Sequence, residues 1–185
     1  TYNDPTIWLE HTLEAMKPDR PDLGWNVQMR NVHVDATGNG LAVVNALRRF
    51  FQFYVDGVNL GSGVQNDWAD VIGPSPDKLL NRRHELHWIA MRLMQEGLLA
   101  IPDRPEYSPI WADLSSIRLA DKGLDKFAVE DKRAFIKREG RSPDFGDSVL
   151  LACSRVDPTR IRFATVPRRV GLNGRRPPPR GYLGA

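Results

Sequence analysis

The sequence predicts an α/β fold for most of this 185-residue chain. The first observation is an apolar strand, residues 31–35, which ends in Asp35 and is followed at once by a glycine-rich turn. Apolar residues with helical spacing then run from 41 to about 50, and a second strand follows over 53–60. A helix between two strands indicates that the strands are parallel. Ligands of such sheets bind beyond the carboxyl ends of the strands, where Asp35 would lie.

The predicted domain spans residues 1–156, and a tail rich in arginine and proline, residues 157–185, follows it. Apolar residues make up 41% of the chain and charged residues 26%, which is typical of a globular protein with a buried core. From Arg155 onward the chain has eight arginines and one acid, which gives this segment a charge of +7. The net charge of the whole chain is +3, so the rest of the chain carries −4. Interleaved proline, glycine and arginine predict a disordered tail, and its charge favours contact with a polyanion.

Several classes of protein are excluded by what the sequence lacks. No apolar run approaches the roughly 20 residues of a membrane span and no secretory signal opens the chain, so we expect a cytoplasmic protein without a membrane partner. The single cysteine, Cys153, excludes an internal disulfide framework and a multi-cysteine zinc site, and we expect it to be buried as a small apolar residue. The chain begins at Thr1 without an obvious opening strand, which predicts an excerpt of a longer polypeptide.

Turn residues and apolar spacing predict the remaining elements. A helix over about 5–16 and a surface loop over 17–26 precede the strand that ends in Asp35, and residues 61–76 form a long loop of the kind that is usually functional or mobile. Further along, we expect the longest helix over 76–95, with Leu79, Leu86, Ile89, Leu93 and Met94 on one stripe. A strand at 98–101, a helical turn at 110–114 and a hairpin that pairs 116–119 with 126–129 should follow it. The last predicted helices span 130–140 and 142–153, and Ser142 is the expected cap of the second one.

Two motifs resemble ligand-binding sites, one for zinc and one for a dinucleotide, but neither has the spacing that its site requires. His84 and His87 are three residues apart, whereas the zinc-protease motif needs two histidines four apart, so the stretch 84–87 is expected to be a partly exposed helix face. Gly38 and Gly40 follow a strand as in a dinucleotide-binding turn, but the third glycine of that motif is missing. No phosphate-binding loop of the G-x-x-x-x-G-K-[ST] type occurs in the sequence.

The predicted last helix has two acids on one face. Asp144 and Asp147 are three residues apart, and Asp147 shares its face with the apolar Leu150 and Leu151. A carboxylate drawn toward a core needs a cation partner, whereas Asp144 in the first turn is also explained by the helix dipole. Oxygen ligands from Asp35 and Asp147, without a cluster of Cys or His, favour Mg²⁺ or Mn²⁺ over zinc.

Five stretches taken together, in this order along the chain, resemble the C-terminal nuclease domain of tailed-bacteriophage terminase large subunits. The acid at the end of a strand and the helix that opens with Ser-Pro-Asp-x-x-Asp are the more specific of them. The likeness covers roughly Thr1 to Cys153. The stretches are Val34-Asp35-Ala36-Thr37-Gly38-Asn39-Gly40, Gly57-Val58-Asn59-Leu60-Gly61, Asn81-Arg82-Arg83-His84-Glu85-Leu86-His87-Trp88, Ile101-Pro102-Asp103 and Gly140-Arg141-Ser142-Pro143-Asp144-Phe145-Gly146-Asp147.

The resemblance implies an RNase H-like (RuvC-type) fold, a mixed sheet flanked by helices, from which the N-terminal strands are missing here. In that family, acidic residues hold two divalent metals, Mg²⁺ or Mn²⁺, which cut double-stranded DNA concatemers during genome packaging in the host cell cytoplasm. Carried over by position, Asp35 and Asp147 would be catalytic metal ligands, and Asp144 an accessory ligand or a helix-start charge.

The resemblance also implies partners, namely double-stranded DNA, a portal protein, a small terminase subunit and an ATPase motor domain upstream. Phosphate contacts should dominate such DNA binding and weaken with salt. Arg82, Arg83 and Arg141 are the candidate DNA contacts, although a solvated or salt-bridged helix face also explains the Arg82–Arg83 pair.

Two departures from the family pattern limit what the resemblance implies. The first catalytic acid of the family lies on an opening strand that this sequence does not contain, and Asp4 lies too close to a predicted helix start to replace it. The ATPase motor is also absent. We therefore expect little or no nuclease activity from this chain alone, and the alternative function is a non-catalytic RNase H-like module that docks to DNA or to a portal.

Overall fold

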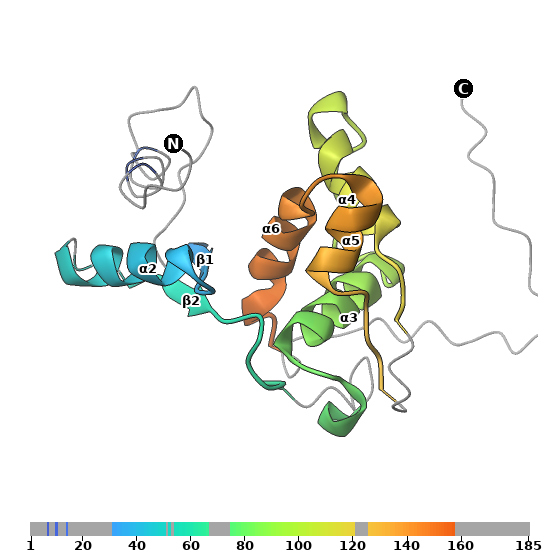
Figure 1. The fold of residues 1–185 in the computed structure, drawn as a ribbon, viewed down its shortest axis with the longest axis horizontal. Coiled ribbons are helices and arrows are strands. Elements are labelled where there is room, and N and C mark those ends of the chain that lie inside the picture. The colour runs from blue at the N-terminus through green and yellow to red at the C-terminus, as the bar shows by residue number, and fades with distance from the viewer. Residues whose placement is uncertain are drawn as a thin grey trace, which may run out of the picture.

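The computed structural model describes residues 31–50, 52, 54–66, 75–120 and 126–157, together with three helical positions at 7, 10 and 14. These residues form a mixed α/β structure with five helices and a two-stranded parallel sheet (Figure 1). The α/β prediction is therefore confirmed at this level. The predicted loop over 17–26, the tail over 158–185 and most of the first helix lie outside the described residues.

The elements follow the chain in an order close to the predicted one. They are β1 (His33–Asp35), α2 (Asn39–Phe50), β2 (Asp56–Val58), the 3₁₀ turn η3 (Pro76–Lys78), α3 (Arg82–Gln95), η4 (Pro105–Tyr107), α4 (Ser108–Ser116), α5 (Lys132–Glu139), α6 (Asp144–Ala152) and η5 (Cys153–Arg155).

The strand–helix–strand unit forms as the sequence predicts. β1 and β2 are parallel, with Asp35 opposite Val58 in the register, and α2 is the crossover between them. The ladder extends one residue further, because the amide of Ala36 donates to the carbonyl of Val58 at 2.8 Å. The strand that pairs is short and includes Gly57, which separates the two apolar stretches of the predicted strand 53–60.

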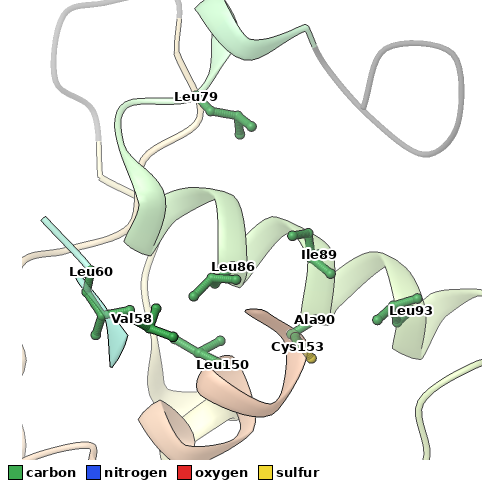
Figure 2. Close-up of a cluster of buried hydrophobic side chains, with 9 residues drawn as sticks. All are labelled: Val58, Leu60, Leu79, Leu86, Ile89, Ala90, Leu93, Leu150 and Cys153. Atoms are coloured by element: carbon green, nitrogen blue, oxygen red, sulfur yellow. The ribbon is translucent and has the colours of Figure 1, made fainter. Parts of the chain in front are cut away.

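The described residues have two clusters of buried apolar side chains. The smaller cluster lies between α2 and the sheet. It consists of Val43, Val44, Leu47 and Val55, and Val32 and Val34 pack against it. The larger cluster joins α3 to α6 and to the end of β2. Figure 2 shows Leu150 and Cys153 facing Leu86 and Ala90, with Val58 beside Leu150. The buried position expected for Cys153 is confirmed, and burial raises the pKa of its thiol to about 11.

Three predicted elements differ from those in the structure, each for a local reason. The long helix begins at Arg82 rather than near 76, because the side chain of Asn81 caps it by accepting from the amide of His84. Residues 98–101 form no strand, since the amides of Leu98 and Leu99 both fold back onto the carbonyl of Leu93 after the left-handed Gly97. The turn predicted at 110–114 is part of a longer helix, α4.

The pairing predicted for the hairpin is present as isolated bridges rather than strands. Leu119 lies opposite Val129 in antiparallel fashion, and the amide of Ala120 donates to the carbonyl of Ala128 at 3.0 Å. The second segment also bonds to η3, because the amide of Phe127 donates to the carbonyl of Lys78. The turn of the hairpin, 121–125, lies outside the described residues.

No helix in the described part of the chain is long and apolar enough to cross a membrane.

Candidate functional site

The first turns of α5 and α6 meet at a lysine that contacts two acids. Lys132 begins α5, which is capped by the side chain of Asp131. Its Nζ donates to Oδ2 of Asp147 at 2.9 Å and to Oδ1 of Asp144 at 3.1 Å, both on α6. The cation partner that the sequence predicted for Asp147 is therefore Lys132. Because Asp144 and Asp147 are separated by one helical turn, a single ammonium group can reach both.

The two acids differ in their exposure to solvent. The side chain of Asp147 is 11% exposed, whereas that of Asp144 is 72% exposed. Burial alone would raise the pKa of Asp144, but hydrogen bonds from Ser142 and Lys132 hold that pKa below its usual value. Burial alone would lower the pKa of Lys132, but Asp147 and then Asp144 raise it. Both pKa directions favour a charged Lys132 beside a charged Asp144.

Ser142 does not cap α6 as predicted. The residue before the helix is Pro143, which has no side-chain cap bond, and the hydroxyl of Ser142 instead donates to Oδ1 of Asp144 at 2.5 Å. The serine thus orients an acid rather than a backbone amide.

Asp35 lies at the carboxyl end of β1, as predicted. Its Oδ1 accepts from the backbone amide of Thr37 at 2.9 Å and from the hydroxyl of the same residue. This arrangement is an Asx-type turn, in which the acid helps to reverse the chain before α2. Asp35 is half-buried, and the α6 helix that carries Asp147 packs against β1.

Carboxylate oxygens are the donors that Mg²⁺ and Mn²⁺ prefer, but the ligand set is incomplete. In residues 31–157, apart from the gaps in the description, no three His, Cys, Asp or Glu side chains are grouped so that they could hold a metal ion. Asp144 and Asp147 converge on Lys132, and Asp35 bonds to Thr37. These residues therefore do not make a complete two-metal site by themselves.

Arg82 lies inside the structure rather than on a DNA-binding face. Its side chain is 1% exposed, and Nη1 forms an ion pair with Oε2 of Glu85 at 2.8 Å, although the two groups are not aligned as a hydrogen bond. Nη2 donates to the carbonyl of Ser154. Glu85 is fully buried and also accepts from the amides of Gln65 and Asn66. The alternative of a salt-bridged helix face fits this placement, except that the face is buried rather than solvated.

The other two candidate DNA contacts are also held by the protein. Arg83 is partly buried and donates to the carbonyl of Glu130 at 2.7 Å, and burial lowers its pKa although Asp147 acts in the opposite direction. Arg141 is bonded to Oδ1 of the fully buried Asp113, yet its side chain remains 40% exposed. Of the three arginines, Arg141 has the most room to contact a phosphate.

The stretch 84–87 is buried, which corrects the expectation of a partly exposed helix face. Nδ1 of His84 accepts from the amide of Val129 at 3.0 Å, so this histidine fastens the hairpin segment to α3. His87 is also buried, and Nε2 has no hydrogen-bond partner among the described residues. Burial, helped by the nearby charge of Arg83, lowers the pKa of His87 to about 3.

We expect replacement of His87 by Met to reduce the loss of stability in acid. The folded pKa of His87 is about 3, below the ordinary value of 6.5, so between these values the unfolded chain binds a proton that the folded chain does not. Stability from this group is complete above pH 6.5 and falls as the pH decreases, by about 2.7 kcal/mol at pH 4.5. Urea unfolding of both proteins between pH 7 and pH 4.5 measures the difference, and parallel pH profiles would contradict the prediction.

Lys132 and Asp113 were not predicted from the sequence. The apolar neighbours of Asp147 indicated that its carboxylate needs a cation partner. The spacing of residues did not identify that partner as a lysine 15 residues earlier in the sequence. Asp113 lies in α4, accepts from the amide of Gly146 at 2.9 Å and so fixes the start of α6. A Cβ at Gly146 would lie 2.9 Å from the Cβ of Asp113, which explains the glycine in the Asp-x-x-Asp turn.

Comparisons with protein-family models, curated proteins and solved structures give no match for this chain.

Proposed function

We propose that this chain is a nuclease-type module of a phage terminase large subunit, which acts on double-stranded DNA with the help of a divalent metal. The observation that carries the proposal is the packing of α6, with its two acids in the first turn, against the strand that ends in Asp35. Acids from distant parts of the sequence thus belong to neighbouring elements. Carboxylate oxygens near the carboxyl end of a strand are the kind of ligand that Mg²⁺ or Mn²⁺ prefers.

In this proposal Asp35 and Asp147 are the metal ligands and Asp144 is accessory. A bound metal would supply Lewis-acid stabilisation of charge on a phosphate oxygen. The chain's own residues would orient the ligands: Thr37 fixes the Asp35 carboxylate, and Lys132 together with Ser142 fixes the two acids of α6. Because the set of ligands is incomplete, we propose that the module cuts DNA only weakly unless further residues complete the site.

Titration calorimetry with Mn²⁺ tests the proposed ligands. We expect Asp35→Asn and Asp147→Asn each to weaken Mn²⁺ binding at least about tenfold, or about 1.4 kcal/mol, because each removes a charged oxygen ligand. Asp103→Asn is the matched control, since it removes the same charge from an exposed loop. Equal affinities for all three variants would contradict the assignment. Robust Mn²⁺-dependent cleavage of plasmid by the unaltered chain, abolished by Asp35→Ala, would contradict the expectation that the module cuts DNA only weakly. It would not contradict the assignment of the metal ligands.

The alternative function is a non-catalytic RNase H-like module for docking to DNA or to a portal protein. The position of Lys132 favours this alternative, because its ammonium group already pairs with both acids of α6 and offsets one of their two charges. A docking module would show no Mn²⁺ binding that depends on Asp35 or Asp147. The same calorimetric experiment therefore separates the two functions.

A further inference from the structure

A second feature of the structure lies at the other end of the sheet from Asp35. Tyr54 comes just before β2, and because β1 and β2 are parallel, it lies near the amino ends of both strands. Tyr54 is 66% exposed.

Two guanidinium groups lie over the ring of Tyr54. Those of Arg48, from the last turn of α2, and Arg155, from the end of η5, are each 5.8 Å from the ring centroid. Arg49 is the neighbouring exposed residue of α2. We call Arg48, Arg49, Tyr54 and Arg155 the basic surface. Residues far apart in the sequence thus bring two guanidinium groups to the ring of Tyr54, and Arg49 is a further basic residue in the last turn of α2.

The charges of Arg48 and Arg155 are only partly compensated. Nε and Nη2 of Arg48 donate to the carbonyl of Val55, which orients the guanidinium without neutralising it. Nε of Arg155 lies 3.3 Å from Oδ2 of Asp56, and this carboxylate is shared with Nδ1 of His33 at the same distance. Arg155 keeps 45% of its side chain exposed in this pair. Planar guanidinium groups held in this way can bind phosphate oxygens with two parallel hydrogen bonds.

We propose that the basic surface binds the phosphate backbone of double-stranded DNA. The choice of DNA as the polyanion depends on the proposed function, whereas the surface itself is separate from the acids of that function. Arg155 is also the first of the eight arginines that end the sequence, so the surface lies where the basic segment begins. Because seven more arginines follow Arg155 in the sequence, a long polyanion suits this region better than a single small anion.

Fluorescence anisotropy with a labelled 20-bp duplex in EDTA tests the proposal, because EDTA removes any metal-dependent binding. We expect Arg48→Gln/Arg155→Gln to raise the Kd about tenfold and to lower the slope of log Kd against log salt by about 2. The control Arg92→Gln/Arg104→Gln removes the same charge from α3 and from the residue before η4, and it should leave the Kd within about twofold. The arginine-rich tail beyond Arg155 is identical in every variant, so it cannot account for a difference.

A second variant guards against a folding defect in the double mutant. Arg49→Glu reverses a charge on the exposed side of α2 without touching the bonds to Val55 or Asp56, and we expect it to weaken binding several-fold. Thermal unfolding by circular dichroism confirms that each variant is folded.

The possible outcomes separate this proposal from the proposed function. If both surface variants bind the duplex as tightly as the control, the basic surface is not a DNA contact, whatever Mn²⁺ does. If they lose DNA binding while Asp35→Asn and Asp147→Asn leave both DNA and Mn²⁺ binding unchanged, the surface is supported and the metal site fails. Binding to phosphatidylserine vesicles is measured for the same variants. If the two surface variants lose affinity for the vesicles but keep their affinity for the duplex, the choice of DNA is overturned.

Discussion

Replacing Arg82 by Met should destabilise the protein by about 3 kcal/mol, because it leaves a buried carboxylate without its charge partner. Glu85 is fully buried and pairs with Arg82 at 2.8 Å, while its two oxygens also accept from backbone amides of the loop at 65–66. Those two amides compensate the charge of Glu85 only in part, because neither carries a full positive charge. Urea unfolding followed by circular dichroism measures the change.

Two controls show whether the buried charge is the cause of this loss. Arg92→Met breaks a surface ion pair with Glu96, also 2.8 Å long, and should change the free energy of unfolding by less than about 1 kcal/mol. Arg82→Met/Glu85→Gln should recover part of the loss, because glutamine carries no charge but can still accept from one loop amide. If Arg82→Met costs no more than Arg92→Met, the buried pair does not stabilise the fold.

Gly40→Ala should be the most disruptive single-methyl change in the strand–helix unit, with a cost of at least about 3 kcal/mol. A Cβ at this position would lie 1.7 Å from the carbonyl oxygen of Asp35, which is backbone and cannot turn aside. Either β1 or the start of α2 must therefore move. Denaturation with urea, followed by far-UV circular dichroism, measures the loss.

Gly38→Ala is the matched control two residues earlier in the same turn. Gly38 has a φ of +62°, but a Cβ added there would meet nothing within 4 Å, so only the left-handed backbone opposes the change, at about 1 kcal/mol. Equal losses for the two variants would show that the turn relaxes around Gly40. The contact between Gly40 and Asp35 also explains this glycine without a dinucleotide, the ligand that a pair of glycines after a strand suggests.

The strand–helix–strand unit was predictable because its signals are local. Alternating valines, glycines after an acid and helically spaced apolar residues lie within 30 residues of each other, and the structure places β1, α2 and β2 accordingly. The start of α3 was missed because the proline near 76 and the asparagine at 81 are both good helix starts, and the side chain of Asn81 makes the cap.

The candidate site was predictable only in part, because its contacts are long-range. The need of Asp147 for a cation follows from its apolar neighbours, but the choice of Lys132 depends on how α5 meets α6. The burial of the 84–87 stretch depends in the same way on the hairpin segment that bonds to His84. Neither packing partner can be read from helical spacing, which identifies the faces of a helix but not what covers them.

The two separate clusters of buried apolar side chains have a consequence for how the chain opens. Among the described elements, α2 makes its extensive contacts with β1 and β2, and Figure 1 shows these three to one side of the other helices. Because Val58 at the end of β2 packs in the larger cluster, an opening of this unit would have to free that residue while α3 and α6 stay packed around the rest of their core. Asp35 belongs to the first unit and Asp147 to the second, so such an opening would also separate the strand that ends in Asp35 from the helix that carries Asp147.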